Sequence, residues 1–239
     1  MKIGFMHKEG RMKYVYEMVK NDYETEVFDD HCFDYDVIVM GMDYFDEHSF
    51  DGKYLSNLKN TVIFVCYDAS EIMKEQFRVV CLKNSEDFLV KNAQITAWGI
   101  LAILLQSCEE CLNETVVDVI GYGRCGKAIV QLLDALGVQC RVIVKQVKKY
   151  TREVMHFEEY LFKKPAKWVI QTADVCIFDH AWVLRSGKPI IIDITSKFVG
   201  TKNLQDEDIV IYYAKALPDH YCIKSSAKTY YEALLEVLV

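Results

Sequence analysis

The sequence predicts an α/β fold made of two units in series, each built around a parallel β-sheet. Short runs of β-branched and aromatic residues alternate with segments of helical periodicity, which is the pattern of parallel α/β sheets. The alternation restarts after one long apolar helix. Hydrophobic residues make up 51% of the 239 residues, enough to bury one large core or two modest ones.

The first unit is predicted over residues 1–90. Strands are expected at residues 2–5, 26–28, 36–40, 61–67 and 79–82, and a helix at 11–20. Ser85-Glu86-Asp87 then caps a helix that runs through Asn92 to Leu112 and is apolar on all sides. A helix of this kind is buried, so residues 91–114 are predicted to be an inter-domain helix.

The second unit is predicted over residues 115–225. Strands are expected at residues 116–120, 140–144, 174–178, 190–194 and 209–213, with a helix at 126–136. The last segment, 226–239, is amphipathic and is predicted to be a helix that packs back on the N-terminal domain.

A glycine-rich motif stands between the first strand and the first helix of the second unit. Gly121-Tyr122-Gly123-Arg124-Cys125-Gly126 has G-x-G-x-x-G spacing in the context that dinucleotide binding requires. Gly121 allows a sharp turn, Gly123 allows the backbone to approach a pyrophosphate, and Gly126 allows the helix to lie close to the sheet. The helix N-terminus offers free N–H groups to the phosphates.

The fold class that follows is a Rossmann-type doubly wound parallel sheet preceded by a smaller flavodoxin-like α/β domain. Gly121, Gly123, Arg124, Cys125 and Gly126 are its predicted cofactor-binding residues. A glycine-rich turn that binds no ligand is the alternative.

The residue after the second strand of the unit favours NADP over NAD, although NAD remains possible. An acidic side chain there would bind the ribose 2′-hydroxyl, whereas basic side chains accept a 2′-phosphate. The strand ends at Lys145, and Lys148 follows within the same loop. We therefore expect Lys145 and Lys148 to contact the 2′-phosphate. A solvated basic loop is the alternative.

The glycine motif and three further segments resemble the A subunit of dipicolinate synthase. The chain looks like a short and divergent member of that family, which is related to the NAD(P)-binding domain of D-2-hydroxyacid dehydrogenases. The segments are 89–99, 190–197 with Gly200-Thr201, and Ala216-Leu217-Pro218 followed by Lys224-Ser225. Trp98 stands where that family has an acid, and Asp219-His220 where it has glycine and an apolar residue.

The resemblance implies an NADP-dependent oxidoreductase that converts a hydroxylated tetrahydrodipicolinate to dipicolinate with loss of water during sporulation. It also implies a small-molecule dicarboxylate as substrate and, as partner, a flavoprotein-like B subunit. We further expect a homo-oligomer. Two alternatives remain: a D-2-hydroxyacid dehydrogenase-like enzyme, and a non-catalytic NAD(P)-binding subunit or sensor.

Polar residues expected at strand ends are the candidates for the remaining site, because ligands of open α/β sheets bind there. His180, Lys197 and His220 are the predicted catalytic residues, since a dicarboxylate needs cationic donors and a histidine can exchange protons near neutral pH. Further cofactor contacts are expected from Asp193, Thr195 and Ser196, and from Asn92 and Thr96 at the start of the long helix.

Composition argues against several other classes. The net charge of −7 and pI near 5.4 argue against nucleic acid as a partner. The apolar run from Ile95 to Leu105 is shorter than the roughly 18 to 20 residues that span a bilayer, and no signal-peptide pattern precedes it, so we expect a cytoplasmic protein without a membrane segment. Nine scattered cysteines predict free thiols, and His7, His31, His48 and His156 show no metal spacing, so no metal site is predicted.

Overall fold

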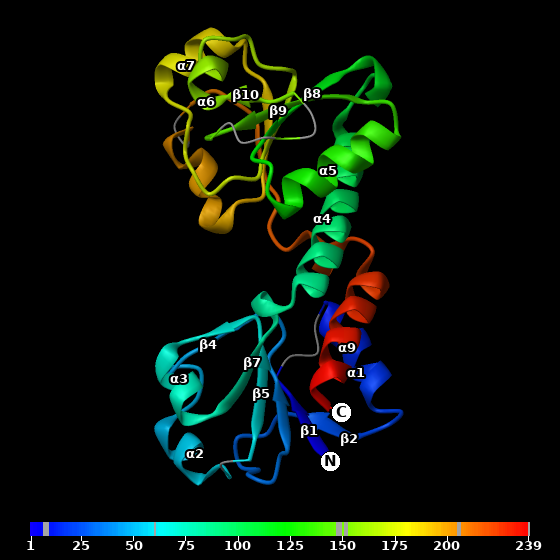
Figure 1. Ribbon diagram of the computed structural model, residues 1–239, viewed down its shortest axis with the longest axis vertical. Helices are drawn as coiled ribbons and strands as arrows, with labels where there is room; N and C mark the ends of the chain where they lie inside the picture. Colours follow the sequence, from blue (N-terminus) through cyan, green and yellow to red (C-terminus); the bar gives the residue numbers. More distant parts are fainter. Residues whose placement is uncertain (7–9, 60, 147–149, 151–152, 205–206, 239) are drawn as a thin grey trace. The chain divides into compact units, whose positions relative to one another are not determined.

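The computed structural model describes residues 1–6, 10–59, 61–146, 150, 153–204 and 207–238 (Figure 1). The chain divides into two compact units. Unit 1 contains Met1–Asn92 and Pro218–Val239, and unit 2 contains Ala93–Leu217. The chain thus leaves unit 1, forms unit 2 and returns.

Unit 1 is built on a five-stranded sheet in the order β2-β1-β3-β5-β7, in which every pair is parallel. Ranked along the chain this order is 2-1-3-4-5, which is the flavodoxin-like arrangement that the sequence predicts. The strands are β1 (Lys2–Phe5), β2 (Glu24–Val27), β3 (Val37–Val39), β5 (Ile63–Cys66) and β7 (Arg78–Cys81).

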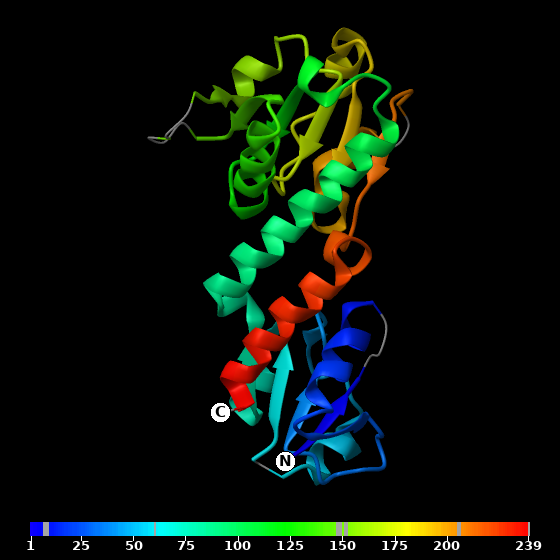
Figure 2. The same cartoon turned by 90° about the vertical axis from the view of Figure 1, so that its right-hand side faces the viewer.

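Unit 1 also contains helices and a small two-stranded sheet. They are α1 (Arg11–Val19), α2 (Gly52–Asn57), α3 (Glu71–Gln76) and α9 (Ile223–Leu238), with β4 (Tyr44–Phe45) paired to β6 (Asp68–Ala69). α9 lies beside α1, and Tyr230 and Leu234 share a buried cluster with Ile3 and Val15 (Figure 2). The C-terminal helix therefore belongs to the core of unit 1.

The long helix α4 (Glu86–Ser107) begins in unit 1 and continues into unit 2. The prediction that this helix runs to Leu112 is wrong, because the helix ends at Ser107 and a 3-10 turn, η2, occupies Leu112–Glu114. Glu109 and Glu110 would place two negative charges at the negative end of the helix dipole, which disfavours its extension. α4 is long and apolar enough to span a bilayer by length and composition, but half of that window is buried in the protein, so the match is weak.

Unit 2 is built on a six-stranded, all-parallel sheet in the order β10-β9-β8-β11-β12-β13. Ranked along the chain this order is 3-2-1-4-5-6, that of the Rossmann fold. The predicted fold class is therefore confirmed. The strands are β8 (Val116–Ile120), β9 (Gln139–Val144), β10 (Met155–His156), β11 (Trp168–Gln171), β12 (Ile190–Asp193) and β13 (Ile211–Tyr213).

The helices that follow these strands are α5 (Arg124–Ala135), α6 (Phe157–Tyr160) and α7 (His180–Ser186), and a 3-10 segment, η3 (Ser196–Leu204), follows β12. A short helix, α8 (Leu217–His220), begins at the last residue of unit 2.

One predicted strand is wrong. Residues 174–178 form a loop, and the strand between β8 and β12 is instead β11, Trp168–Gln171. Both segments are short and apolar, so periodicity alone does not separate them. Val175 and Ile177 still pack against the core of unit 2, which explains their apolar character without a strand.

Candidate dinucleotide site

The glycines of the motif differ in what surrounds them. Gly121, directly after β8, has φ +98°, and a Cβ atom there would lie 2.6 Å from the Thr172 hydroxyl oxygen. A Cβ atom on Gly126 would lie 2.2 Å from the carbonyl oxygen of Gly121, whereas no atom lies within 4 Å of the Cβ position at Gly123. Two glycines thus allow the turn and the close helix, and the third leaves open space for a ligand.

The N-terminus of α5 opens onto that space. Gly123 is the N-cap and has no side chain with which to cap the first-turn N–H groups, and the first turn contains no acidic residue. The positive end of the helix dipole and its free donors therefore favour an anion here. Arg124 and Lys127 are exposed in the same turn and add positive charge.

The side chain of Cys125 adds no negative charge that would offset this positive charge. Burial, together with the carboxylate of Asp174, raises the pKa of its thiol, although Arg124 acts in the opposite direction. The side chain is therefore a neutral thiol at physiological pH.

A hollow of about 440 Å³ adjoins the glycine loop. Its walls come from the loop itself, from the end of β9 with Lys145, and from the loop after β11, residues 173–175. Tyr150 lies over it, with its ring 5.5 Å from that of Tyr122 in an edge-on contact. The structure thus brings the predicted residues Gly121, Gly123 and Lys145 to one hollow. Lys148 lies outside the described residues.

Gln171, which sequence analysis did not single out, holds one wall of this hollow. Its side chain is fully buried, and its amide nitrogen donates to the carbonyl oxygens of Ala173 (2.7 Å) and Val175 (2.9 Å). Gly200 passes so close that a Cβ atom there would lie 2.2 Å from Cγ of Gln171. No sequence signal could have identified this role, because the strand was expected six residues later.

Asp193 organises the loop after β12. Its buried carboxylate accepts hydrogen bonds from the Thr195 N–H (2.8 Å), the Thr195 hydroxyl (2.6 Å) and the Thr201 hydroxyl (2.6 Å). Ser196 is exposed and its N–H donates to the Asp174 carboxylate at 3.0 Å, which connects this loop to the hollow. Asp193 and Thr195 thus lie where they shape the loop, and Ser196 lies where a ligand can reach it.

Lys197 and Phe198 follow in a strained conformation. Both have φ of 53°, in the left-handed region that non-glycine residues rarely adopt. The Lys197 side chain is exposed, and the Phe198 ring contacts that of Tyr213 at 4.7 Å. Strain of this kind clusters at functional loops, and the catalytic role of Lys197 stays a prediction.

The sequence pattern predicts that His180 directly follows a strand, and this is wrong. It is the first residue of α7, after an eight-residue loop that begins beyond β11, and its Nδ1 lies 2.6 Å from a carboxylate oxygen of Glu207. The imidazole is largely exposed, and Asp179 caps the helix by accepting from the N–H of Trp182. The local geometry differs from the one expected, and the catalytic role of His180 stays a prediction.

Asn92 and His220 belong to unit 1, while Thr96 is a buried residue of α4 in unit 2. The Asn92 side-chain oxygen accepts a hydrogen bond from Arg11 at 2.9 Å, and Arg11 also pairs with Asp219 at 2.6 Å. Arg11 is 3% exposed, so this cluster ties α1, α4 and α8 together inside unit 1. The Asp219 carboxylate has a structural partner, and His220 beside it is exposed.

A second polar cluster lies on the sheet of unit 2 and was also missed by sequence reasoning. The buried carboxylate of Asp118 on β8 accepts two hydrogen bonds from Arg141 on β9 (2.6 and 2.7 Å), one from the Tyr160 hydroxyl (2.9 Å) and one from the Ala166 N–H (2.7 Å). Burial, with the Asp118 carboxylate beside it, raises the pKa of Tyr160 well above its ordinary value. This cluster joins β8, β9 and α6 and does not line the hollow.

The fold of this chain is found in solved structures, although no protein-family profile and no curated protein sequence matches it. The A subunit of dipicolinate synthase from Bacillus halodurans is similar with a TM-score of 0.86 at 15% identity, over 100% of this chain and 97% of that one. The same protein from Bacillus subtilis gives a TM-score of 0.82 at 15% identity, over 100% and 95%.

The NADPH-dependent glyoxylate/hydroxypyruvate reductase of Sinorhizobium meliloti, solved with NADP and malonate, is similar with a TM-score of 0.56 at 13% identity, over 95% of this chain and 90% of that one. The likeness to the A subunit of dipicolinate synthase and to 2-hydroxyacid dehydrogenases, which the sequence motifs suggest, is thus found again in three dimensions. Because the identities are only 13% to 15%, this likeness establishes the shared fold alone.

Proposed function

We propose that this protein is a pyridine-nucleotide-dependent oxidoreductase whose unit 2 binds NADP in preference to NAD. The observation that carries the proposal is the open space at Gly123, which adjoins an uncapped helix N-terminus and a hollow lined by Lys145. This space is open, and a diphosphate matches the donors and the positive charge around it.

The residues present fit each part of such a cofactor. The N–H groups at the start of α5 would hold the pyrophosphate, and Lys145, directly after β9, would pair with the 2′-phosphate. Tyr150 and residues 173–175 line the hollow and would contact the base of the nucleotide. The bound nicotinamide supplies a two-electron acceptor, and the chain supplies position and charge.

The reaction proposed is oxidation of a cyclic hydroxylated dicarboxylate to an aromatic dicarboxylate, which the likeness to dipicolinate synthase supports. The reaction would release one water and one proton from the substrate, and a bound NADP would supply the acceptor for the remaining two electrons and proton. Lys197, on its strained loop, binds a substrate carboxylate, and His180 of the same unit exchanges the proton. A flavoprotein-like B subunit is the protein partner that we propose for this reaction.

Titration of the chain with both cofactors tests the choice of nucleotide. We expect NADP to bind at least tenfold more tightly than NAD, and Lys145→Asp to remove that difference because it replaces a cation with an anion at the 2′-phosphate. Lys13→Asp, at an exposed lysine of α1 in unit 1, is the matched control and should leave both affinities unchanged. Tighter binding of NAD to the wild-type chain would refute the preference for NADP.

A second candidate is a D-2-hydroxyacid dehydrogenase-like activity, and the close pair of His180 and Glu207 favours it. The absorbance of NADPH separates the candidates when 2-hydroxy acids and cyclic imine dicarboxylates are offered in turn. Turnover of a 2-hydroxy acid alone would support the second candidate. Tight NADP binding without turnover of either class, even with a flavoprotein partner, would indicate a sensor.

We also propose that the protein forms a homo-oligomer. Trp98 and Leu105 on α4 are 50% and 62% exposed, and large apolar side chains of a long helix are commonly covered by a partner. Light scattering on the purified chain tests this, and Trp98→Glu should shift any oligomer toward the monomer.

A further inference from the structure

β13 is an edge strand of unit 2, and its outer side is unpaired. It stands last in the sheet order, beside β12, and no described strand pairs with its other side. The carbonyl oxygen of Val210 accepts a hydrogen bond from β12, and the N–H of Ala214 donates one to it. Backbone groups alternate in direction along a strand, so Ile211 and Tyr213 turn their N–H and C=O groups outward.

The run of residues that contains β13 carries no charge. Residues 209–214 read Ile-Val-Ile-Tyr-Tyr-Ala, which combines high β propensity with the absence of proline and glycine. Val210, Tyr212 and Tyr213 are 54%, 38% and 47% exposed. A strand of this kind with a free outer side is a template for pairing with another strand, so soluble proteins protect such edges or cover them.

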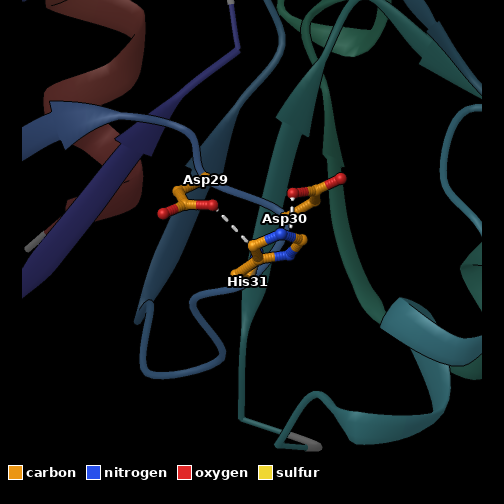
Figure 3. A group of neighbouring side chains, drawn as sticks. All are labelled: Asp29, Asp30 and His31. Carbon is orange, nitrogen blue, oxygen red and sulfur yellow. Dashed lines mark hydrogen bonds and ion pairs between the residues drawn. The ribbon is translucent and has the colours of Figure 1, made fainter.

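The other edge strands of the two large sheets are protected in ways that β13 is not. β2 carries Glu24 and Glu26, and Asp29, Asp30 and His31 lie together in the loop that follows it (Figure 3). This exposed group, to which we assign no metal, adds charge beside the strand. β7 begins with an arginine, and β10 is only two residues long. The unprotected edge of β13 therefore indicates a strand that a partner covers.

The residues on either side of the uncharged run have opposite charges. Glu207 and Asp208 precede it, and the exposed Lys215 follows it. Glu207 contacts His180 through one carboxylate oxygen, which leaves the other for a second partner. Two copies of the run that pair antiparallel place the acidic start of one beside the basic end of the other, whereas a parallel pair would align like charges. A twofold axis generates the antiparallel arrangement.

We propose that β13 pairs antiparallel with β13 of a second copy of this chain, centred on Ile211, so that the sheets of unit 2 in the two copies become one continuous sheet. The two Ile211 residues lie opposite each other and exchange two backbone hydrogen bonds. In this register Val210 faces the partner's Tyr212, and Lys215 lies opposite the partner's Glu207. Other registers that pair the outward-facing residues do not place Lys215 opposite an acid.

This inference rests on the proposed homo-oligomer and names a surface for it that is separate from Trp98 and Leu105 on α4. Sedimentation equilibrium of the full chain over a range of concentrations measures the association. Ile211→Pro removes an outward N–H group and leaves the hydrogen bonds to β12 in place, so it should weaken the association at least tenfold. The association should persist in Trp98→Glu.

Val27→Pro is the matched control. Val27 is 49% exposed on β2, the edge strand of unit 1, and the N–H of the next residue, Phe28, donates to β1. By the same alternation the N–H of Val27 points outward. This variant therefore makes the same change on an edge strand that is protected by charge, and it should associate like the wild-type chain.

Reversal of charge tests the register and does not depend on the proline variant. Lys215→Glu should weaken the association about tenfold, because two opposite-charge pairs become like-charge pairs, and the addition of Glu207→Lys should restore it. A wild-type chain that stays monomeric, unchanged association in Ile211→Pro, loss of association in Trp98→Glu, or no recovery in the double variant would overturn the proposal. None of these measurements uses a nucleotide, so their outcome is distinguishable from a failure of the proposed cofactor site.

Discussion

Gly123 and Gly126 stand three residues apart in one motif, and their surroundings assign them opposite physical roles. At Gly126 a single added carbon would collide with the backbone of Gly121 at 2.2 Å, and backbone cannot rotate away. At Gly123 the space is open, and its φ of −78° suits any residue. Gly126 is thus required by the fold, whereas Gly123 would be required by a ligand that occupies the open space.

A matched pair of alanine variants measures this difference. Gly126→Ala should lower the free energy of unfolding by about 1 to 3 kcal/mol because the helix must move away from the sheet. Gly123→Ala should change it by less than about 0.5 kcal/mol and yet weaken NADP binding at least tenfold. Chemical denaturation and calorimetry give the two quantities. The reverse order of stabilities would contradict the geometry described for this turn.

Glu26 on β2 provides a pH-dependent contribution to the stability of unit 1. The Tyr35 hydroxyl donates to it at 2.8 Å and the Lys2 ammonium group lies at 3.2 Å, and these two hydrogen bonds lower the pKa of the carboxyl below its ordinary value of 4.5. A carboxyl whose pKa is lower in the folded state stabilises the fold fully above pH 4.5. That contribution is lost as the pH falls through the folded-state pKa.

We therefore expect the stability of the wild-type chain to exceed that of Glu26→Gln at neutral pH, and the difference to shrink as the pH falls below 4.5. Urea denaturation at a series of pH values measures it. A difference that is independent of pH would show that the charge of Glu26 contributes nothing.

At the scale of elements, the cluster around Asp118 holds β8, β9 and α6 in register. The Asp118 side chain is fully buried, whereas that of Arg141 is 34% exposed, so the carboxylate depends on its partners more than the guanidinium does. Arg141→Met leaves that carboxylate buried without a counter-ion and should lower the free energy of unfolding by about 3 kcal/mol. Arg141→Lys keeps the charge and should lose less. Thermal denaturation that finds both variants as stable as the wild-type chain would contradict this assignment.

The elements that sequence predicted well are those whose signal is local. The strand from Val116 and the helix after Gly123 follow from one apolar run and one glycine motif, and Lys145 follows from its position after the next strand. The strand at Trp168–Gln171 was missed because a second apolar run at 174–178 competes with it. Only pairing with β8 and β12 decides between the two, and pairing is not a local property.

The supporting polar contacts could not be predicted for the same reason. Asp193 meets Thr201 only after a 3-10 turn closes the loop, and Arg11 meets Asp219 across 208 positions of sequence. A sequence pattern identifies such residues as polar groups near strand ends or helix starts. It does not say whether a carboxylate faces a ligand or a neighbouring side chain, and Asp193 and Asn92 face neighbours.

At the scale of the whole molecule, the chain places its two ends in the same unit. Met1–Asn92 and Pro218–Val239 form unit 1, where Ala227, Tyr230 and Leu234 of α9 pack in one core with residues of β1 and α1. Unit 2 is an uninterrupted segment between two crossings of the chain. Its sheet order, its glycine turn and its hollow are all contained in that one segment, so the cofactor proposal does not depend on unit 1.

Isothermal titration calorimetry of the full chain with NADP tests the central claim most directly. We predict one saturable site per chain that binds NADP more tightly than NAD and is lost in Gly123→Asp, a variant that keeps its fold. Absence of heat at saturating concentrations of either nucleotide, or unchanged binding in Gly123→Asp, would contradict the assignment of this turn as a dinucleotide site.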